Sequence, residues 1–262
     1  MRMFEQYRLG NLDAIGTRVV LDLWPRRPAW AAASISELDA AFFAGLVMES
    51  KPARLLEIGV ASAWVSCVLL EALRQAGLDT SDVYGVDIAD RFFYDADYAT
   101  GQCVRDVLPD RLPRYHLATN VTTGEYASRG EIDALEFVFI DAHHMHPWAT
   151  LDLLALLPLV EANAWIAMHD LNLSLKEDQD HQNRGPKYLF EGWDQDKMHS
   201  VQDPTMAGAI RIGGNPSSHL PLLLDILYTP WEIPVEPRAC DPVCALISRA
   251  YGEAWAEKFR RA

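Results

Sequence analysis

The chain has 262 residues, half of them hydrophobic, which is enough for one well-buried domain and too short to favour two large ones. Its formal net charge of -14 would repel a phosphate backbone and argues against nucleic acid as a partner. No apolar run approaches the roughly 18 residues of a membrane span, and no signal core begins the chain, so we expect a cytoplasmic protein without a membrane partner. Its four cysteines are too few and too scattered for a disulfide framework or a paired zinc site.

The first half of the chain alternates helical and strand-like patterns. Ser34 and Glu37 stand at capping-box spacing before apolar residues at helical intervals, which predicts a helix ending near residue 50. Residues 54–58 then have the character of a buried strand, and the helical pattern after them is closed by Gly77. A second strand is expected within residues 82–90, with an acid at its end.

The second half repeats this alternation. Strands are expected at residues 114–120, 135–141 and 164–170, and the last two enclose a helix with Pro147 in its first turn and Asn163 in a left-handed position at its end. Residues 172–196 are polar and broken by Gly185 and Pro186, so they are expected to be more loop than regular element. Two short strands around a turn at Asp203 and Pro204 predict a hairpin that closes the sheet.

These patterns predict an α/β fold: a doubly wound, Rossmann-like, mostly parallel sheet of seven strands with helices on both faces. We expect a single domain, residues 1–262, with an N-terminal helical cap at 1–50, a core sheet at 51–213 that carries a lid insertion at 172–197, and a C-terminal extension at 214–262. Ligands of such sheets bind at the carboxyl ends of the strands, which directs attention to the residues that follow each strand.

The turn after the first strand contains small residues where a backbone can approach a ligand at the start of a helix. It reads GVASAW and follows the acid Glu57. A dinucleotide motif GxGxxG would need glycine at Ala61 and Trp64, which disfavours NAD. The second strand ends at another acid, Asp87, which suits hydrogen bonds to ribose hydroxyls.

At these residues the sequence resembles the class I S-adenosylmethionine-dependent methyltransferases, and most closely their small-molecule O-methyltransferase-like branch. The stretch LLEIGVASAWVS matches the acid and first glycine of the family's first motif, and the likeness covers residues 54–170 through VYGVDIAD, FVFIDAHH and LLPLVEANAWIAMHD. The sequence departs from the family at Ala61 and Ala63, where later glycines of the turn are usual, and at Asn163 and Ala164, which replace a Gly-Gly pair.

The resemblance implies S-adenosylmethionine as cofactor and assigns residues to it. Glu57 would organise the methionine amino group, Asp87 would hold the ribose, and Asn120 would contact adenine. The remaining cofactor-binding positions that it implies are Gly59, Ala61, Ser62, Ile88 and Asp141. Taken alone, Glu57 is equally a strand-end carboxylate that caps local amides, and Asp87 a helix N-cap.

Transfer of a methyl group from a sulfonium to a hydroxyl needs in-line alignment and removal of the hydroxyl proton, by a base or with the help of a divalent ion. Asp141 and Asp170 follow adjacent strands, so both carboxylates should reach the same rim. The resemblance places a metal at Asp141, His169 and Asp170, although an imidazole ligand suits a transition metal better than Mg²⁺. Whether a metal is required stays open.

The segment DAHHMHP supplies three histidines after the fourth strand. His144 matches a histidine that recurs in similar sequences and is the predicted base or acceptor-orienting residue, with Asp141 as the second catalytic residue. His143 and His146 have weaker claims, and all three could instead cap amides near Pro147 or pair with Asp141.

The sequence therefore predicts an S-adenosylmethionine-dependent methyltransferase that acts on a hydroxyl of a small molecule or a sugar-bearing metabolite. One alternative is a non-catalytic binding module of the same fold. Another is a metal-dependent hydrolase or hydroxylase that uses Asp141, His144, His146 and Asp170. The identity of the methyl acceptor and the oligomeric state, a homo-oligomer included, are left open.

Overall fold

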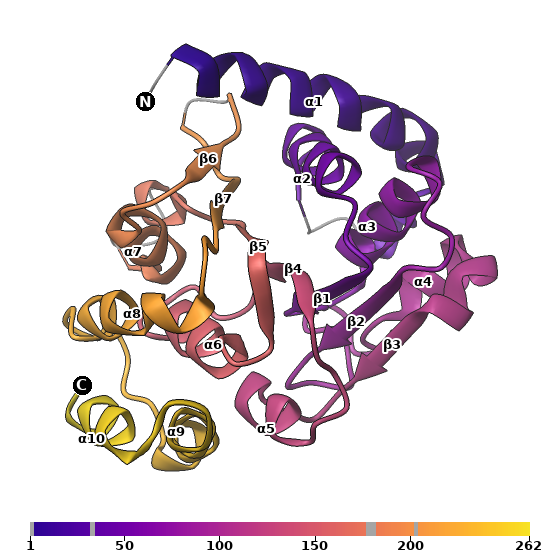
Figure 1. Ribbon diagram of the computed structural model, residues 1–262. Helices are drawn as coiled ribbons and strands as arrows, with labels where there is room; N and C mark the ends of the chain where they lie inside the picture. Colours follow the sequence, from indigo (N-terminus) through magenta and orange to yellow (C-terminus); the bar gives the residue numbers. More distant parts are fainter. Residues whose placement is uncertain (1–2, 32–34, 177–181, 202–203) are drawn as a thin grey trace.

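The computed structural model describes residues 3–31, 35–176, 182–201 and 204–262 and contains one seven-stranded sheet in the order β3-β2-β1-β4-β5-β7-β6 (Figure 1). Neighbouring strands from β3 through β5 pair in parallel, and β7 is antiparallel to both β5 and β6. The strands are β1 (Arg54–Ile58), β2 (Asp82–Val86), β3 (Tyr115–Ala118), β4 (Leu135–Ile140), β5 (Val160–Met168), β6 (Lys197–His199) and β7 (Gly208–Arg211). The predicted mostly parallel sheet and its closing hairpin are confirmed.

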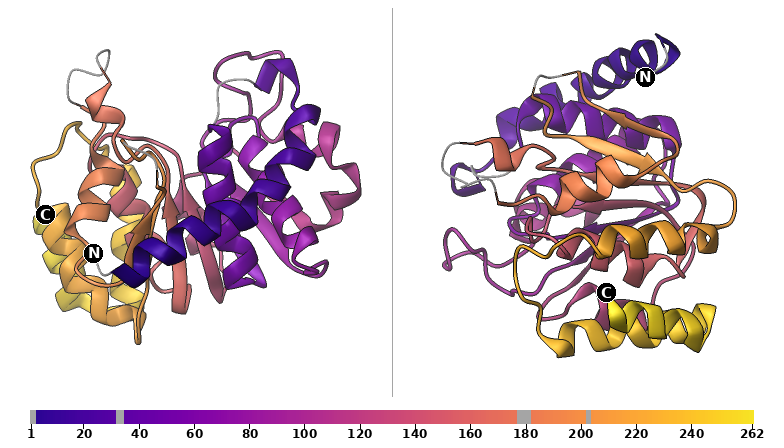
Figure 2. Two further views of the ribbon diagram at one scale, coloured as in Figure 1. Left: turned by 90° about the horizontal axis from the view of Figure 1, so that it is seen from above. Right: turned by 90° about the vertical axis from the view of Figure 1, so that its left-hand side faces the viewer.

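Helices cover both faces of this sheet, as predicted, and Figure 2 shows the two layers on either side of it. One hydrophobic cluster joins the sheet to α1 (Met3–Leu23), α2 (Glu37–Ser50), α3 (Trp64–Gln75) and α4 (Gln102–Val107). The second cluster joins the opposite face to α5 (Thr123–Ser128), α6 (Trp148–Leu156), α7 (Gly185–Gly192), α8 (Leu220–Leu227), α9 (Pro237–Tyr251) and α10 (Glu253–Arg261). The sheet is therefore buried on both sides, and ligands can reach it only at its edges.

Two local predictions about helix ends were wrong. Helix α2 is capped by Ser36, whose hydroxyl accepts a hydrogen bond from the Asp39 amide, whereas Ser34 lies outside the described residues. Asn163 has the predicted left-handed backbone, with φ of 69°, but it lies within β5, because helix α6 already ends at Leu156. There its N–H donates to the carbonyl of Ile212.

The segment 172–197 is more regular than predicted, because it contains the helix α7. Pro186 stands in the first turn of α7, where a missing N–H costs nothing, so a residue interpreted as a breaker starts the helix. The buried side chain of Leu189 attaches α7 to the second hydrophobic cluster. Of the predicted hairpin turn, Pro204 is described and Asp203 lies outside the described residues.

In the described part of the chain, no helix combines the length and the apolar character that crossing a membrane requires.

Candidate active site

The sheet register brings the predicted acids to one edge. Ile58 pairs with Val86 on one side and with Ile140 on the other, so Asp87 and Asp141 each follow a direct neighbour of Ile58. Ile140 in turn pairs with Met168, which puts His169 and Asp170 at the same level. These residues meet because parallel strands end together, as the sequence predicted.

The turn after β1 keeps a conformation that glycine adopts most readily. Gly59 has φ of 83°, and a Cβ added there would lie 2.2 Å from the carbonyl oxygen of Asp141, so only glycine lets β1 and the end of β4 approach so closely. Ala61 and Ala63 are also left-handed, with φ of 50° and 68°. The two departures from glycine therefore retain the turn, with backbone strain at each alanine.

Asp87 ties this turn to the end of β2. Its Oδ2 accepts a hydrogen bond from the Ala61 N–H and its Oδ1 accepts one from the Ala89 N–H, both at 2.9 Å. Ala89 lies outside any helix, so Asp87 is not a helix N-cap. Beside it the apolar side chain of Ile88 is 73% exposed.

Glu57 is buried beneath the turn, where its carboxyl accepts a hydrogen bond from the Ser66 hydroxyl rather than from local amides. Burial, opposed by the Ser66 hydrogen bond and reinforced by the charges of Asp141 and Asp87, raises the pKa of Glu57 to about 8. A neutral Glu57 can donate as well as accept a hydrogen bond.

The remaining predicted cofactor positions lie around the same turn. Ser62 is buried, and its hydroxyl accepts a hydrogen bond from the Trp64 N–H. Trp64 is fully buried, with its ring 5.5 Å from that of Trp24, so its indole belongs to the core and leaves the turn open. Asn120 is exposed after β3, with a left-handed φ of 57°.

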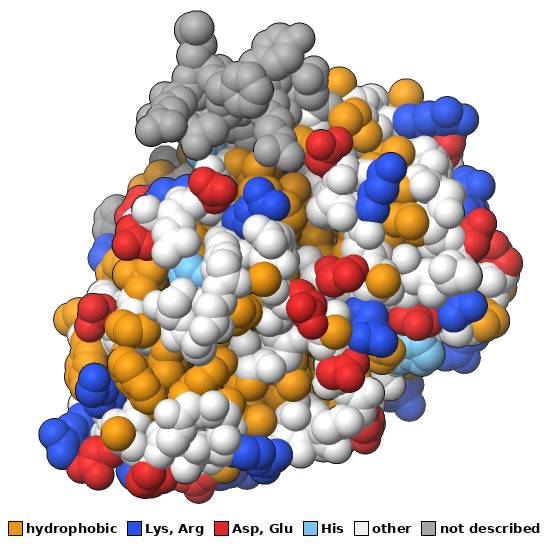
Figure 3. Space-filling view, in the orientation of Figure 1, with side chains coloured by type: hydrophobic (Ala, Val, Ile, Leu, Met, Phe, Trp, Pro, Cys, Tyr) orange, Lys and Arg blue, Asp and Glu red, His pale blue; other side chains and the backbone are white. Residues whose placement is uncertain are grey.

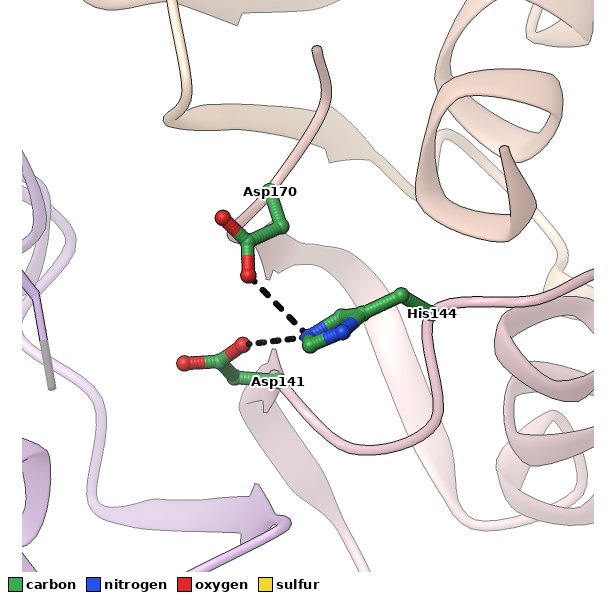
Figure 4. A group of neighbouring side chains, drawn as sticks. All are labelled: Asp141, His144 and Asp170. Atoms are coloured by element: carbon green, nitrogen blue, oxygen red, sulfur yellow. Dashed lines mark hydrogen bonds and ion pairs between the residues drawn. The ribbon is translucent and has the colours of Figure 1, made fainter. Parts of the chain in front are cut away.

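Asp141, His144 and Asp170 converge above β4 and β5 (Figure 4). The Nε2 atom of His144 lies 3.3 Å from Oδ1 of Asp141 and 3.1 Å from Oδ2 of Asp170. One ligand atom from each of the three residues lies within 4.8 Å of the other two, a spacing that could hold a cation.

His169 lies beside this group rather than in it. Its Nδ1 is 3.5 Å from a carboxylate oxygen of Asp141 and of Asp170, and its Nε2 is 3.4 Å from Oδ2 of Asp39. Both ring nitrogens thus face carboxylates, which makes His144, and not the predicted His169, the imidazole best placed to share a cation with the two aspartates.

Charge at the site is balanced by these imidazoles. Burial alone would raise the pKa of Asp141, but the charge of His169 and hydrogen bonds from both histidines outweigh burial and hold that pKa well below its ordinary value. Conversely, burial would lower the pKa values of His144 and His169, but the surrounding aspartates raise both. The aspartates thus stabilise the protonated form of each imidazole, and the imidazoles stabilise the charged form of Asp141.

The other two histidines of this loop have structural roles. His143 is exposed, and its Nδ1 accepts a hydrogen bond from the Met145 N–H at 3.2 Å. His146 is fully buried with its ring 5.3 Å from that of Tyr188, and burial lowers its pKa. His143 therefore caps a backbone amide, as the sequence allowed, whereas His146 packs in the interior.

Sequence reasoning missed two residues that come from outside the strand ends. Asp39, from α2, is buried and faces His169. Glu232, between α8 and α9, accepts a hydrogen bond from the His146 N–H, in the loop that carries His144. A signal for Asp39 was present, since it is an acid within the apolar stretch ELDAAFFAGLV. No local signal marks Glu232.

A cavity of about 500 Å³ lies elsewhere, between α8, α9 and α10, where Figure 3 shows hydrophobic side chains at the surface around the C-terminal helices. Trp231, Cys240, Cys244 and Arg260 are among its lining residues. None of the predicted site residues lines it, so it plays no part in the site at the strand ends.

The sheet order, the small-residue turn after β1, the acid Glu57 within β1 and the acids that follow β2, β4 and β5 are typical of a class I methyltransferase fold. In agreement, residues 56–171 match the sequence family described as a methyltransferase domain. The match falls on the same part of the chain as the resemblance predicted from residues 54–170.

Solved structures with the same fold include an O-methyltransferase from Bacillus cereus in complex with SAH, at 17% identity and a TM-score of 0.51, covering 80% of this chain and 97% of that one. A second is the O-methyltransferase TomG from Streptomyces achromogenes, involved in tomaymycin synthesis and bound to SAM, at 13% identity, a TM-score of 0.51 and coverage of 78% and 90%. A third is a methyltransferase from Geobacter sulfurreducens, at 14% identity, a TM-score of 0.50 and coverage of 74% and 88%. No curated protein matches the chain.

Proposed function

We propose that the protein transfers the methyl group of S-adenosylmethionine to a hydroxyl of a small molecule. One observation carries the proposal. The turn after β1 and the acid Asp87 lie at the same edge of the sheet as the group formed by Asp141, His144 and Asp170. O-methyltransferases of the same fold, solved with SAM or SAH, support both the cofactor and the oxygen acceptor.

The cofactor would lie along the ends of β1 and β2. Asp87, already fixed by two backbone amides, keeps lone pairs for the ribose hydroxyls, and the exposed apolar side chain of Ile88 offers a face to the adenine ring. Glu57 supports the turn from below, while Asn120 borders the adenine side. Gly59, Ala61 and Ser62 provide the backbone against which the methionine part can lie.

Methyl transfer then needs a group that takes the hydroxyl proton while the carbon–sulfur bond breaks and the carbon–oxygen bond forms. We assign this role to His144. Its Nε2 faces Asp141 and Asp170, so when the ring is neutral, the proton on Nε2 is donated to these carboxylates and the lone pair lies on Nδ1. The two carboxylates stabilise the imidazolium that forms when Nδ1 accepts the proton.

Cation binding is a second candidate role for the same three residues, favoured by the 4.8 Å spacing of their ligand atoms. Two carboxylates and one imidazole suit a transition metal better than Mg²⁺. A bound divalent cation would supply Lewis acidity that lowers the pKa of an acceptor hydroxyl. Metal analysis of protein purified without chelators tests this role directly.

The alternatives have less support. In a hydrolase or hydroxylase built on Asp141, His144, His146 and Asp170, His146 would have to reach the cation, but its ring is fully buried against Tyr188. In a non-catalytic module the turn would have no reason to keep left-handed alanines at 61 and 63, which strain the backbone.

Isothermal titration calorimetry with S-adenosylhomocysteine tests the proposed cofactor site. The wild-type protein should give a saturable heat, and Asp87→Ala should weaken binding by about 1–3 kcal/mol, or roughly 5- to 150-fold, because it removes buried hydrogen bonds to ribose. Asp90→Ala, at an exposed acid three residues further along, is the matched control and should bind like wild type. Equal affinity in Asp87→Ala and Asp90→Ala would contradict the assignment.

A further inference from the structure

Glu232 connects three separate segments of the chain next to the candidate active site. It lies between α8 and α9, outside residues 56–171, which match the methyltransferase domain. Its Oε2 accepts a hydrogen bond from the His146 N–H at 2.7 Å and another from the Arg184 N–H at 2.9 Å. Its own N–H donates to the carbonyl of His146 at 3.0 Å. One residue of the C-terminal extension thus holds both the loop after β4 and the start of α7.

A second contact fixes the same loop from the side of α7. The Gly185 N–H donates to the carbonyl of His144 at 2.7 Å. A Cβ on Gly185 would come within 2.8 Å of that oxygen, so this contact requires a glycine. Since Glu232 holds the neighbouring Arg184, its carboxylate also sets where Gly185 meets His144.

These bonds hold the backbone from the His144 carbonyl to His146, directly after the His144 side chain. Hydrogen bonds to a carboxylate are shorter and stronger than neutral ones, and Glu232 is half-buried, which limits competition from water. Because the backbone direction determines where a side chain can point, the position of the His144 imidazole over Asp141 and Asp170 depends on this arrangement. Misplacement of a catalytic group by about 1 Å can cost on the order of 100-fold in rate.

We propose that Glu232 is a positioning residue for the methyl-transfer site, which holds the His144 loop and the start of α7 in the arrangement that catalysis needs. The functional meaning of this inference rests on the proposed role of His144. The arrangement itself makes the C-terminal extension part of the active site rather than an appendage.

The test is a nuclear magnetic resonance experiment on protein labelled with ¹³C at histidine Cε1, which needs neither a methyl acceptor nor a metal. The His144 signal is assigned from its loss in His144→Gln. In Glu232→Ala this signal should shift, split or broaden, while the signal of His116, in the edge strand β3, stays at its wild-type position. Glu232→Gln keeps a side-chain oxygen that can accept both N–H groups, so it should restore the wild-type His144 signal.

Glu236→Ala is the matched control, since Glu236 is exposed and caps α9 without a side-chain hydrogen bond. A wild-type His144 signal in Glu232→Ala would overturn the inference, as would an equal shift of His116, which would mean a general structural change. If Glu232→Ala does not fold, Glu232→Asp replaces it, because its carboxylate is one methylene too short to reach both amides. Calorimetry with S-adenosylhomocysteine should give affinities within twofold of wild type for every folded Glu232 variant. Absence of binding in the wild type would count against the proposed function and leave the His144 result standing.

Discussion

Asp152 is a buried acid far from any proposed chemistry, and its cost to stability should depend on pH. It lies on α6 in the second hydrophobic cluster, where burial, opposed by a hydrogen bond with Thr123, raises its pKa to about 7 from an ordinary value of 3.8. The folded state therefore binds this proton more tightly than the unfolded state does. Stability from this group is full below about pH 4, falls as the pH rises, and is lost above about pH 7.

We therefore expect Asp152→Asn to raise the free energy of unfolding by about 1–3 kcal/mol at pH 8, where the charge is buried, and by much less at pH 5. Urea unfolding at both pH values measures the difference. Asp225→Asn, at an exposed acid on α8, should have a small effect that is the same at both pH values. A gain from Asp152→Asn that does not change with pH would show that burial does not raise this pKa.

The turn between β1 and α3 should be strained, because alanine occupies left-handed positions there. Ala61 is partly exposed, so removing its methyl group loses little burial, while glycine adopts its φ of 50° without a clash. We expect Ala61→Gly to raise the free energy of unfolding by about 0.5–1 kcal/mol, measured by urea unfolding. At Ala76, which has a right-handed φ of -78°, the same substitution should lower it by a similar amount. Losses of equal size at both positions would contradict strain in the turn.

At the level of elements, the core strands could be predicted because each is a short apolar run with both faces buried. A polar residue after the run marks the end of the strand. Strand β1 has the predicted bounds for this reason. Helix α7 could not be predicted in the same way, because Pro186 is as typical of a first helical turn as of a loop. The end of α6 was misplaced because Asn163 satisfies the same left-handed preference within an irregular strand.

The residues of the candidate site also fall into those that could be predicted from the sequence and those that could not. Asp87, Asp141 and Asp170 could be predicted because the strand periodicity alone determines where they meet. The contacts of Asp39 and Glu232 could not, because they depend on how α2 and the segment after α8 pack against the sheet, 130 and 86 positions away from their partners. Local sequence patterns carry no information about such distant pairings.

At the scale of the whole molecule, helices α1 and α2 approach each other closely at two glycines. A Cβ on Gly16 of α1 would lie 1.8 Å from the carbonyl oxygen of Ala41, and a Cβ on Gly45 of α2 would lie 1.9 Å from that of Leu12. The two glycines thus let the helix backbones touch. Apolar residues of both helices belong to the first hydrophobic cluster. Helix α1 is therefore an integral part of the domain.

The effect of Gly16→Ala on the free energy of unfolding should distinguish local helix propensity from tertiary packing, because the two predict changes of opposite sign. In an isolated helix, Gly16→Ala would stabilise by about 0.5–1 kcal/mol, because alanine is the better helix former. Here the added methyl group must push α1 away from α2, so we expect a loss of about 1–3 kcal/mol in the free energy of unfolding, measured by urea unfolding. Arg18→Ala, on the exposed side of the same helix, should change it by less than about 0.5 kcal/mol. A gain from Gly16→Ala would mean that α1 does not pack on α2 in solution.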